Sequence, residues 1–158
     1  MIVARASELD LRRVLGRDEA IIAVGEGDLR GDALASALHS DLLVLASNTR
    51  IVLDTPAAWS GIVWRMGRKA LMFCGAPAIL PATIADLLVP AGRDPLEWTT
   101  EWVGARRAIA FDAAANLIRR RGGDILERAE FARLFAAGEP QKGLAAWLES
   151  RSKNRKQL

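Results

Sequence analysis

The sequence predicts an α/β fold in its first part and a helical region in its last third. An apolar run at residues 20–24 leads through a glycine-bearing loop into a helix rich in small residues, and a second apolar run follows at residues 42–46. Strand, crossover helix and strand is the order of a parallel unit. From Pro95 onward the pattern is helical, with breaks at Gly122-Gly123 and at Gly138-Glu139-Pro140.

Composition narrows the class of protein. The chain has 158 residues, 51% hydrophobic and 26% charged, which suits one domain with a sizeable core. No apolar run approaches the roughly 20 residues of a membrane span, and the N-terminus lacks the apolar core of a signal peptide. We therefore expect a cytoplasmic protein with no membrane partner. Basic clusters at residues 119–121 and 151–156 lack interleaved aromatic residues, so we also expect no nucleic-acid partner.

Each element of the N-terminal part has a local signal. Residues 1–5 predict a short strand, and residues 7–15 predict a helix with Ser7 as its N-cap. The apolar run at 20–24 predicts the next strand, and the small residues at 32–39 predict the crossover helix.

The middle of the chain is punctuated by proline and glycine. Residues 51–53 predict a strand end that Pro56 closes, and residues 63–74 predict a helix with Gly75 at its C′ position. Two short elements complete this part, a helix at residues 82–87 and a strand end at residues 88–89.

Three helices are predicted for the last third of the chain, at residues 95–121, 125–137 and 141–150. Trp98 and Trp102 lie four residues apart in the first of them, so they share one helical face. Such a pair is typical of packing, with a ligand-stacking surface as the alternative.

The glycine-bearing loop is the best candidate for chemistry. Gly25, Gly27 and Gly31 precede a helix, so backbone N–H groups at its N-terminus are placed to stabilise a negative oxygen or a phosphate. The spacing of these glycines does not match a dinucleotide-binding fingerprint.

Three segments of the sequence match, in order, the motifs of one superfamily. EAIIAVGEGDLRGDALASALHSDLLVLAS, residues 19–47, resembles K-P-x-I-A-A-V-x-G, a G-G-G run, a helix and C-D-x-R-I-A-S. RMGRKALMFCGAPAILPATIADLLVP, residues 65–90, resembles R-x-x-G, L-x-L-T-G and A-x-x-G-L-V. EFARLFAAGEPQKGLAAWLESR, residues 130–151, resembles F-x-x-x-F, an acidic turn and E-G-x-x-A-F-x-E-K-R. Together they are similar to the crotonase, or enoyl-CoA hydratase/isomerase, superfamily.

This resemblance implies a fold and an assembly. Residues 1–94 would form a truncated crotonase-like core (a ββα superhelix), and residues 95–158 a C-terminal helical region of the same domain, of the type the family uses for trimerisation. The family's first core strands would precede Met1. A truncated sheet exposes an edge, so we expect a homo-oligomer, a trimer or a hexamer, or a hetero-oligomer with a longer crotonase homologue.

The resemblance also implies a ligand, an acyl-CoA thioester held in an oxyanion hole by two backbone N–H groups, with no other cofactor. The G-G-G run matches Gly31-Asp32-Ala33, which makes the N–H of Asp32 one donor. The second donor would be the N–H of Ser7, in a segment that is otherwise an ordinary helix N-cap. Lys142 and Arg151 match the region near the CoA phosphates, with exposed helix cations as the alternative.

The two glutamates that activate water in the hydratases have no counterpart. The matching positions carry Ala35 and either Thr55 or Ala57, and an alanine methyl cannot act as a general base. The nearest acid is Asp54, a weak candidate for a relocated catalytic residue and otherwise a turn aspartate; Asp32, Asp28 and Glu26 are the remaining acids. We expect reduced or absent hydratase activity, and whether the protein is an enzyme stays open. The alternative is a non-catalytic crotonase-like subunit that acts in assembly or binds a partner.

One histidine and one cysteine are too few for a metal site of the usual kind, so we expect no metal. His39 is either a general base or a satisfied helix residue. Cys74 is either a nucleophile or a small buried residue in the apolar run LMFC, and we expect the buried residue.

Overall fold

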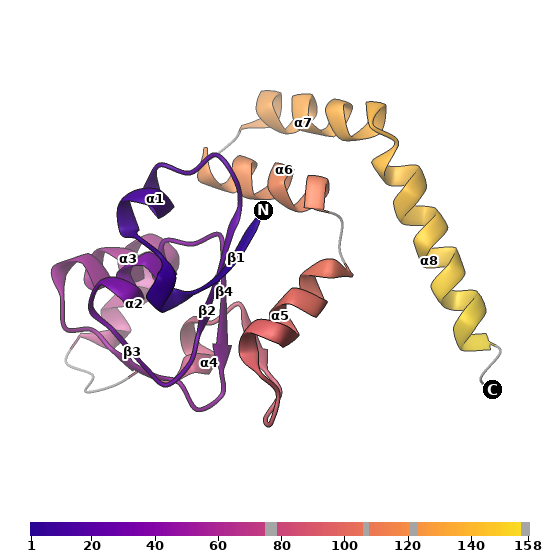
Figure 1. Ribbon diagram of the computed structural model, residues 1–158. Coiled ribbons are helices and arrows are strands. Elements are labelled where there is room, and N and C mark those ends of the chain that lie inside the picture. Colours follow the sequence, from indigo (N-terminus) through magenta and orange to yellow (C-terminus); the bar gives the residue numbers. More distant parts are fainter. Residues whose placement is uncertain (75–78, 106–107, 121–122, 156–158) are drawn as a thin grey trace. The chain divides into compact units, whose positions relative to one another are not determined.

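The protein divides into two compact units, residues Met1–Ala108 and Ile109–Leu158 (Figure 1). The computed structural model describes residues 1–74, 79–105, 108–120 and 123–155. The boundary between the units lies after the division at residue 94 that the sequence suggested, because helix α5 (Pro95–Gly104) packs on the sheet of the first unit.

A parallel four-stranded sheet forms the centre of the first unit, in the order β1-β2-β4-β6. The strands are β1 (Ile2–Arg5), β2 (Ile21–Gly25), β4 (Leu42–Ala46) and β6 (Leu87–Val89). β2 and β4 pair directly and in parallel, with helix α2 (Gly31–Leu38) between them in the chain. The predicted strand, helix and strand unit is therefore confirmed.

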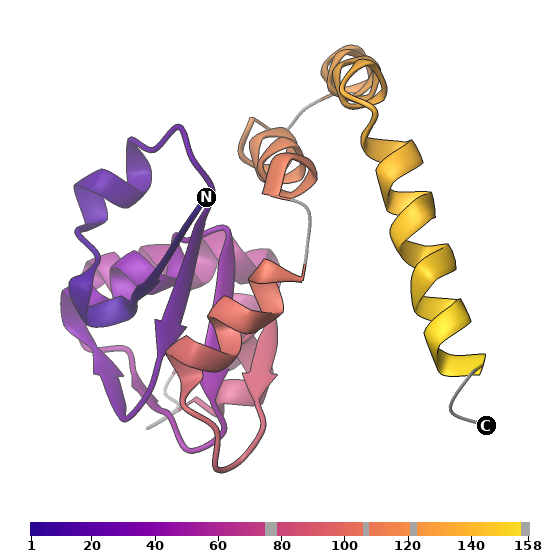
Figure 2. The ribbon, with the colours of Figure 1, turned by 45° about the vertical axis from the view of Figure 1, so that its right-hand side comes forward.

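Helices cover both faces of this sheet (Figure 2). Helix α5 contacts all four strands, and helix α2 contacts β2 on the opposite face and carries helix α3 (Pro56–Met66) behind it. All residues of β2 are buried, as expected for a central parallel strand covered on both sides.

The glycine-bearing loop contains a strand that the sequence analysis missed. β3 (Asp28–Arg30) pairs in parallel with β5 (Arg50–Val52) in a separate two-stranded sheet. Gly27 and Gly31, at φ values of 63° and 58°, flank β3 and make the two turns that glycine adopts most easily. With three residues and one buried apolar side chain, Leu29, this strand has almost no periodic signal.

The start of the chain corrects one helix boundary. A short 3₁₀ turn, η1 (Ala6–Glu8), precedes helix α1 (Leu11–Leu15). Ser7 is not the N-cap of α1, because the carboxylate of Asp10 accepts the hydrogen bonds of the first free N–H groups of that helix.

The middle of the chain corrects two further expectations. Pro56 starts α3 at the position where its missing N–H costs nothing, instead of closing a strand. The helix predicted at residues 63–74 is wrong as one element: α3 ends before Gly67, which has a φ of 55°, and a 3₁₀ segment, η2 (Gly67–Phe73), follows. Helix α4 (Pro81–Ile84) leads into β6, and Gly75 lies outside the described residues.

Helices α2 and α3 approach closely because α3 carries a glycine at the crossing. A Cβ atom placed on Gly61 would lie 2.6 Å from the Cβ atom of Leu38, which is fully buried. This contact fixes α2 against α3.

The amino ends of β4 and β6 are held by the same arrangement. Asp41 donates its N–H to the carbonyl oxygen of Ile21 and accepts the N–H of Ile21 with its carboxylate, at 2.9 and 2.8 Å. Asp86 repeats this with Leu43, at 2.9 and 2.7 Å. Each new strand is thus fastened to the preceding one by an aspartate.

Each of these aspartates is paired with a largely buried arginine. Arg17 pairs with Asp41 at 2.9 Å, and Arg65 pairs with Asp86 at 2.6 Å. Both guanidinium groups also donate to carbonyl oxygens at the C-terminus of α2, where cations are favoured: Arg17 to His39, and Arg65 to Leu38 and Ser40.

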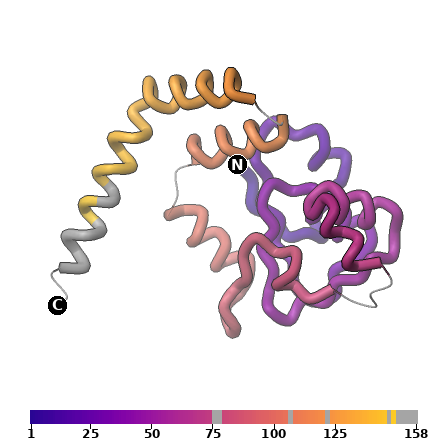
Figure 3. Tube along the Cα trace, turned by 180° about the vertical axis from the view of Figure 1, so that it is seen from behind, coloured from indigo at the N-terminus to yellow at the C-terminus, as the bar shows by residue number. Residues whose placement is uncertain are grey.

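The last part of the chain contains helices α6 (Ala108–Arg119), α7 (Asp124–Ala136) and α8 (Glu139–Arg155), which Figure 3 traces from the opposite side. The single helix predicted at residues 95–121 is therefore two helices. The other two predicted helices are present with shifted ends. Within the described residues, none of the helices is both long and apolar enough to cross a bilayer.

Candidate functional site

The segment after β5 meets α2 at the N-terminus of this helix, and the η1 turn packs against the same helix. The η1 turn, which contains Ser7, packs against α2. Asp54, just after β5, accepts the N–H of Gly31 at 2.9 Å. Asp32 is the second residue of α2 and is exposed. Because the first N–H groups of a helix have no partner within it, this corner combines free donors with the positive end of the helix dipole.

The positions of the two missing glutamates lie in the same region but carry no titratable group. Ala35 is fully buried within α2. Thr55 is the N-cap of α3, and its hydroxyl oxygen accepts the N–H of Ala58 at 3.2 Å. Ala57 is half-buried in the first turn of α3. The Thr55 hydroxyl is occupied by capping, so none of the three can activate water.

The remaining acids are placed differently from one another. Asp54 and Asp32 are exposed at the N-terminus of α2, and Asp28 is exposed on β3. Glu26 pairs instead with Arg5 at the end of β2. Asp54 is the acid whose carboxylate accepts the N–H of Gly31, the residue before the candidate donor Asp32.

The two candidate CoA-binding cations lie in α8, in the second unit. The ammonium of Lys142 pairs with Glu139 at 3.2 Å, and its side chain is mostly exposed. The backbone of Arg151 belongs to α8, but its side chain lies outside the described residues.

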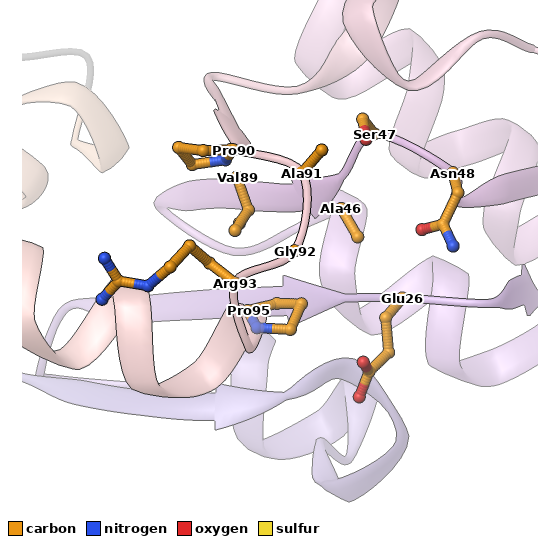
Figure 4. Close-up of a pocket in the computed structure, with 10 residues that line it drawn as sticks. All are labelled: Glu26, Ala46, Ser47, Asn48, Val89, Pro90, Ala91, Gly92, Arg93 and Pro95. Atoms are coloured by element: carbon orange, nitrogen blue, oxygen red, sulfur yellow. The ribbon is translucent and has the colours of Figure 1, made fainter.

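A cavity of about 320 Å³ opens at the carboxyl ends of β2, β4 and β6 (Figure 4). Crevices at this end of parallel strands are the usual ligand sites of open α/β sheets. The lining residues are Glu26, Ala46, Ser47, Asn48, Val89, Pro90, Ala91, Gly92, Arg93 and Pro95. The sequence analysis missed this cavity because three separate strand ends and one loop form it.

The charges around this cavity are already paired. Arg5 contacts Glu26 and also donates to Asp94 at 3.4 Å, and Arg93 pairs with Glu101 at 2.6 Å. The hydrogen bond from the Glu97 N–H is the main reason that the pKa of Asp94 lies below its ordinary value. Both charged side chains among the described lining residues, Glu26 and Arg93, are therefore already paired.

His39 is far from the candidate donors along α2, because it caps the other end of the helix. Its ring lies 5.5 Å from that of Trp64 and is mostly buried. Burial, and then the charges of Arg17 and Arg65, lower the pKa of His39. Among the described residues, no group of three or more His, Cys, Asp or Glu is arranged to hold a metal.

Cys74 is exposed, which corrects the expectation that it is buried. The 3₁₀ segment has a period of three residues, so Ala70 and Phe73 face the core and the next residue faces solvent. A helix with 3.6 residues per turn, as the sequence suggested, would have distributed these side chains differently.

The fold of the chain is similar to that of several solved structures of enoyl-CoA hydratases and isomerases. An enoyl-CoA hydratase subunit I from Geobacillus kaustophilus HTA426 is 21% identical, with a TM-score of 0.69, over 89% of this chain and 63% of that one. An enoyl-CoA hydratase from Polaromonas sp. JS666 is 22% identical, with a TM-score of 0.68, over 89% of this chain and 63% of that one. An enoyl-CoA hydratase/isomerase from Marinobacter aquaeolei is 18% identical, with a TM-score of 0.63, over 89% of this chain and 62% of that one.

These similarities confirm the crotonase-like fold that the motifs implied. The chain spans 62–63% of the length of these three structures. No family model and no curated protein sequence matches the chain.

Proposed function

We propose that the protein binds an acyl-CoA thioester at the N-terminus of α2 and has little or no hydratase activity. The thioester oxygen would accept the N–H of Asp32, with the N–H of Ser7 as the second donor. The observation that carries this proposal is the hydrogen bond that joins the turn after β5 to the start of α2, together with the packing of η1 against the same helix. Named hydratases and isomerases among the similar structures support the choice of ligand.

Loss of hydration follows from the side chains at this corner. A positioned general acid or base typically contributes about 10² to 10⁴ in rate, and Ala35 and Thr55 supply none. Asp54 adds a negative charge beside the donors, which disfavours a developing enolate oxyanion more than a neutral thioester. Binding can therefore persist where catalysis is lost.

Two substitutions at one residue test the donor directly. Asp32→Pro removes the backbone N–H at a position of the first helical turn where proline is tolerated. Asp32→Ala keeps the N–H and removes only the carboxylate. We expect crotonyl-CoA affinity, measured by isothermal titration calorimetry, to fall with Asp32→Pro and to be unchanged or higher with Asp32→Ala. Equal affinity of both variants and the parent chain would reject the site.

Turnover is measured on the same samples, by loss of the enoyl thioester absorbance. Hydration at about 1 to 10³ per second, the usual range for enzymes, would reject a loss of activity. Absence of both binding and turnover with several CoA thioesters would favour the second candidate function.

That second candidate is a non-catalytic crotonase-like subunit in an assembly. It is favoured by β1, which lies at one edge of the sheet. We expect a trimer or a hexamer, or a complex with a longer crotonase homologue. Light scattering of the purified chain tests the homo-oligomer, because a stable monomer at micromolar concentration contradicts it.

A further inference from the structure

The segment between Asp54 and Asp86 contains no acidic residue, although it contains Arg65, Arg68 and Lys69. The charge of Arg65 is neutralised by its ion pair with Asp86. In the part of the chain that the structure describes, the side chains of Arg68 and Lys69 form no ion pair, and both residues are exposed. This stretch is thus a surface whose exposed charge is entirely positive.

The 3₁₀ geometry of η2 sorts its side chains into three ridges, because residues three apart lie above one another. One ridge, Ala70 and Phe73, is buried in the core. The other two face solvent, and each starts with a cation and continues with a large apolar side chain: Arg68 with Leu71, and Lys69 with Met72.

Leu71 and Met72 are unusually exposed for their size, at 75% and 74%. Trp64, in the last turn of α3, is 44% exposed, and α3 packs against η2. Adjacent exposed apolar side chains such as those of Leu71 and Met72 mark a contact surface. Side chains that are three-quarters exposed project from the surface, so they are suited to enter a soft apolar medium and not to line a groove.

We propose that the η2 surface, formed by Arg68, Lys69, Leu71 and Met72, docks on an anionic lipid membrane. Projecting apolar side chains beside basic ones are the arrangement with which peripheral proteins enter the headgroup region, and Trp favours the same depth. Charge complementarity selects the anionic lipid, since no carboxylate lies in this segment to repel it. This contact is peripheral and needs no membrane-spanning segment. The expectation of no membrane partner rested on the absence of such a segment, so it does not address a peripheral contact. The membrane contact is independent of the thioester site.

Vesicle co-sedimentation of the full chain tests the proposal. We expect binding to vesicles of phosphatidylcholine and phosphatidylserine in equal amounts, and not to phosphatidylcholine alone. Arg68→Gln with Lys69→Gln should weaken binding roughly 25-fold, since each basic residue near an anionic surface contributes about fivefold. The double variant Leu71→Ser with Met72→Ser should no longer sediment with the vesicles. High salt should weaken vesicle binding by the parent chain.

Helix α1 supplies a matched control with the same residue types. It carries adjacent cations, Arg12 and Arg13, and Leu15, which is 61% exposed, but Asp10, Asp18 and Glu19 lie beside them in the sequence. Substitution of Arg12 and Arg13 by Gln and of Leu15 by Ser should leave vesicle binding nearly unchanged. An equal loss in this control would overturn the assignment to η2.

Cys74 is the sole cysteine in the sequence, directly follows η2 and is exposed, so it can carry a polarity-sensitive fluorophore. We expect a blue shift of its emission with anionic vesicles. Absence of binding, equal binding to neutral vesicles, or an unshifted fluorophore would overturn the proposal. The proposal would also be overturned if the parent chain self-associated without binding vesicles and the double variant Leu71→Ser, Met72→Ser no longer self-associated. The η2 surface would then be a contact between copies of the chain.

Discussion

Asp54 accepts the N–H of Gly31 at 2.9 Å, although the two residues are 23 positions apart in the chain. The carboxylate thereby caps α2, whose N-cap residue, Arg30, makes no side-chain capping bond. A carboxylate in this position stabilises the helix through its free N–H and its dipole. Asp54 thus has a structural role that does not require it to be a relocated catalytic acid.

Substitution of Asp54 should lower stability and should not lower turnover. Asp54→Ala removes the cap and should cost about 0.5–2 kcal/mol, whereas Asp54→Asn keeps an acceptor oxygen and should cost much less. Urea unfolding measures both, with Asp28→Asn as the control at an exposed aspartate of the neighbouring strand. Any residual hydration should be unchanged or higher in Asp54→Asn, because this variant removes the negative charge beside the candidate donors. A large loss of turnover in that variant would restore Asp54 as a catalytic candidate.

The close approach of α2 and α3 makes Gly61 sensitive to a single methyl group. Gly61→Ala would place a carbon 2.6 Å from Leu38 and should destabilise the protein by about 1–3 kcal/mol through overpacking. Gly104, in the last turn of α5, has nothing within 4 Å of an added Cβ. Gly104→Ala should therefore be neutral or slightly stabilising. Thermal unfolding of the two variants compares them, and similar melting temperatures would contradict the helix crossing.

Two buried serines of the α2 region should respond in opposite directions. The hydroxyl of Ser36 has no hydrogen-bond partner within the described residues, so Ser36→Ala should raise stability by about 1 kcal/mol. The hydroxyl of Ser40 donates to the carbonyl of Ala37 at 2.6 Å and also contacts Arg65. Ser40→Ala should lower stability by about 1–3 kcal/mol. Denaturant midpoints test the pair, and a destabilised Ser36→Ala variant would indicate a missed partner of that hydroxyl.

His39 should make the protein sensitive to mild acid. Burial and two nearby arginines lower its pKa in the folded protein below the ordinary value of 6.5, so the unfolded chain takes up the proton first. Stability should be full above about pH 6.5 and should fall as the pH drops through the window below it. His39→Gln should flatten this dependence in melting temperatures recorded between about pH 5 and pH 8. An identical slope in the variant would assign the acid sensitivity to other groups.

The sequence predicts the centre of the fold well because local signals and the tertiary structure agree there. The apolar runs that form β2 and β4 are read directly from composition, and small residues fit the buried helix between them. Strand β3 is not predicted from the sequence, because three residues carry too little hydrophobic periodicity. In η2 an apolar stretch of suitable length for a helix adopts a period of three, and its surface side chains change accordingly.

The candidate site is predictable in part. Gly31 and Asp32 are placed at a helix N-terminus by sequence alone, since glycine and an acidic first turn are local features. The hydrogen bond from the N–H of Gly31 to Asp54 cannot be predicted from the sequence, because it depends on how β5 pairs with β3. Ser7 shows the opposite case: its predicted capping role is wrong, yet its turn does pack on α2.

The aspartate fastenings of β4 and β6 bear on how the molecule is made. The order of strands across the sheet is the order in which they are synthesised, and β4 and β6 are each fixed to the preceding strand by the aspartate just before them. A chain emerging from the ribosome can therefore lay down β1, β2, β4 and β6 one beside another without waiting for its far end. Such stepwise growth keeps loop closures short and limits the time during which an unfinished edge is exposed.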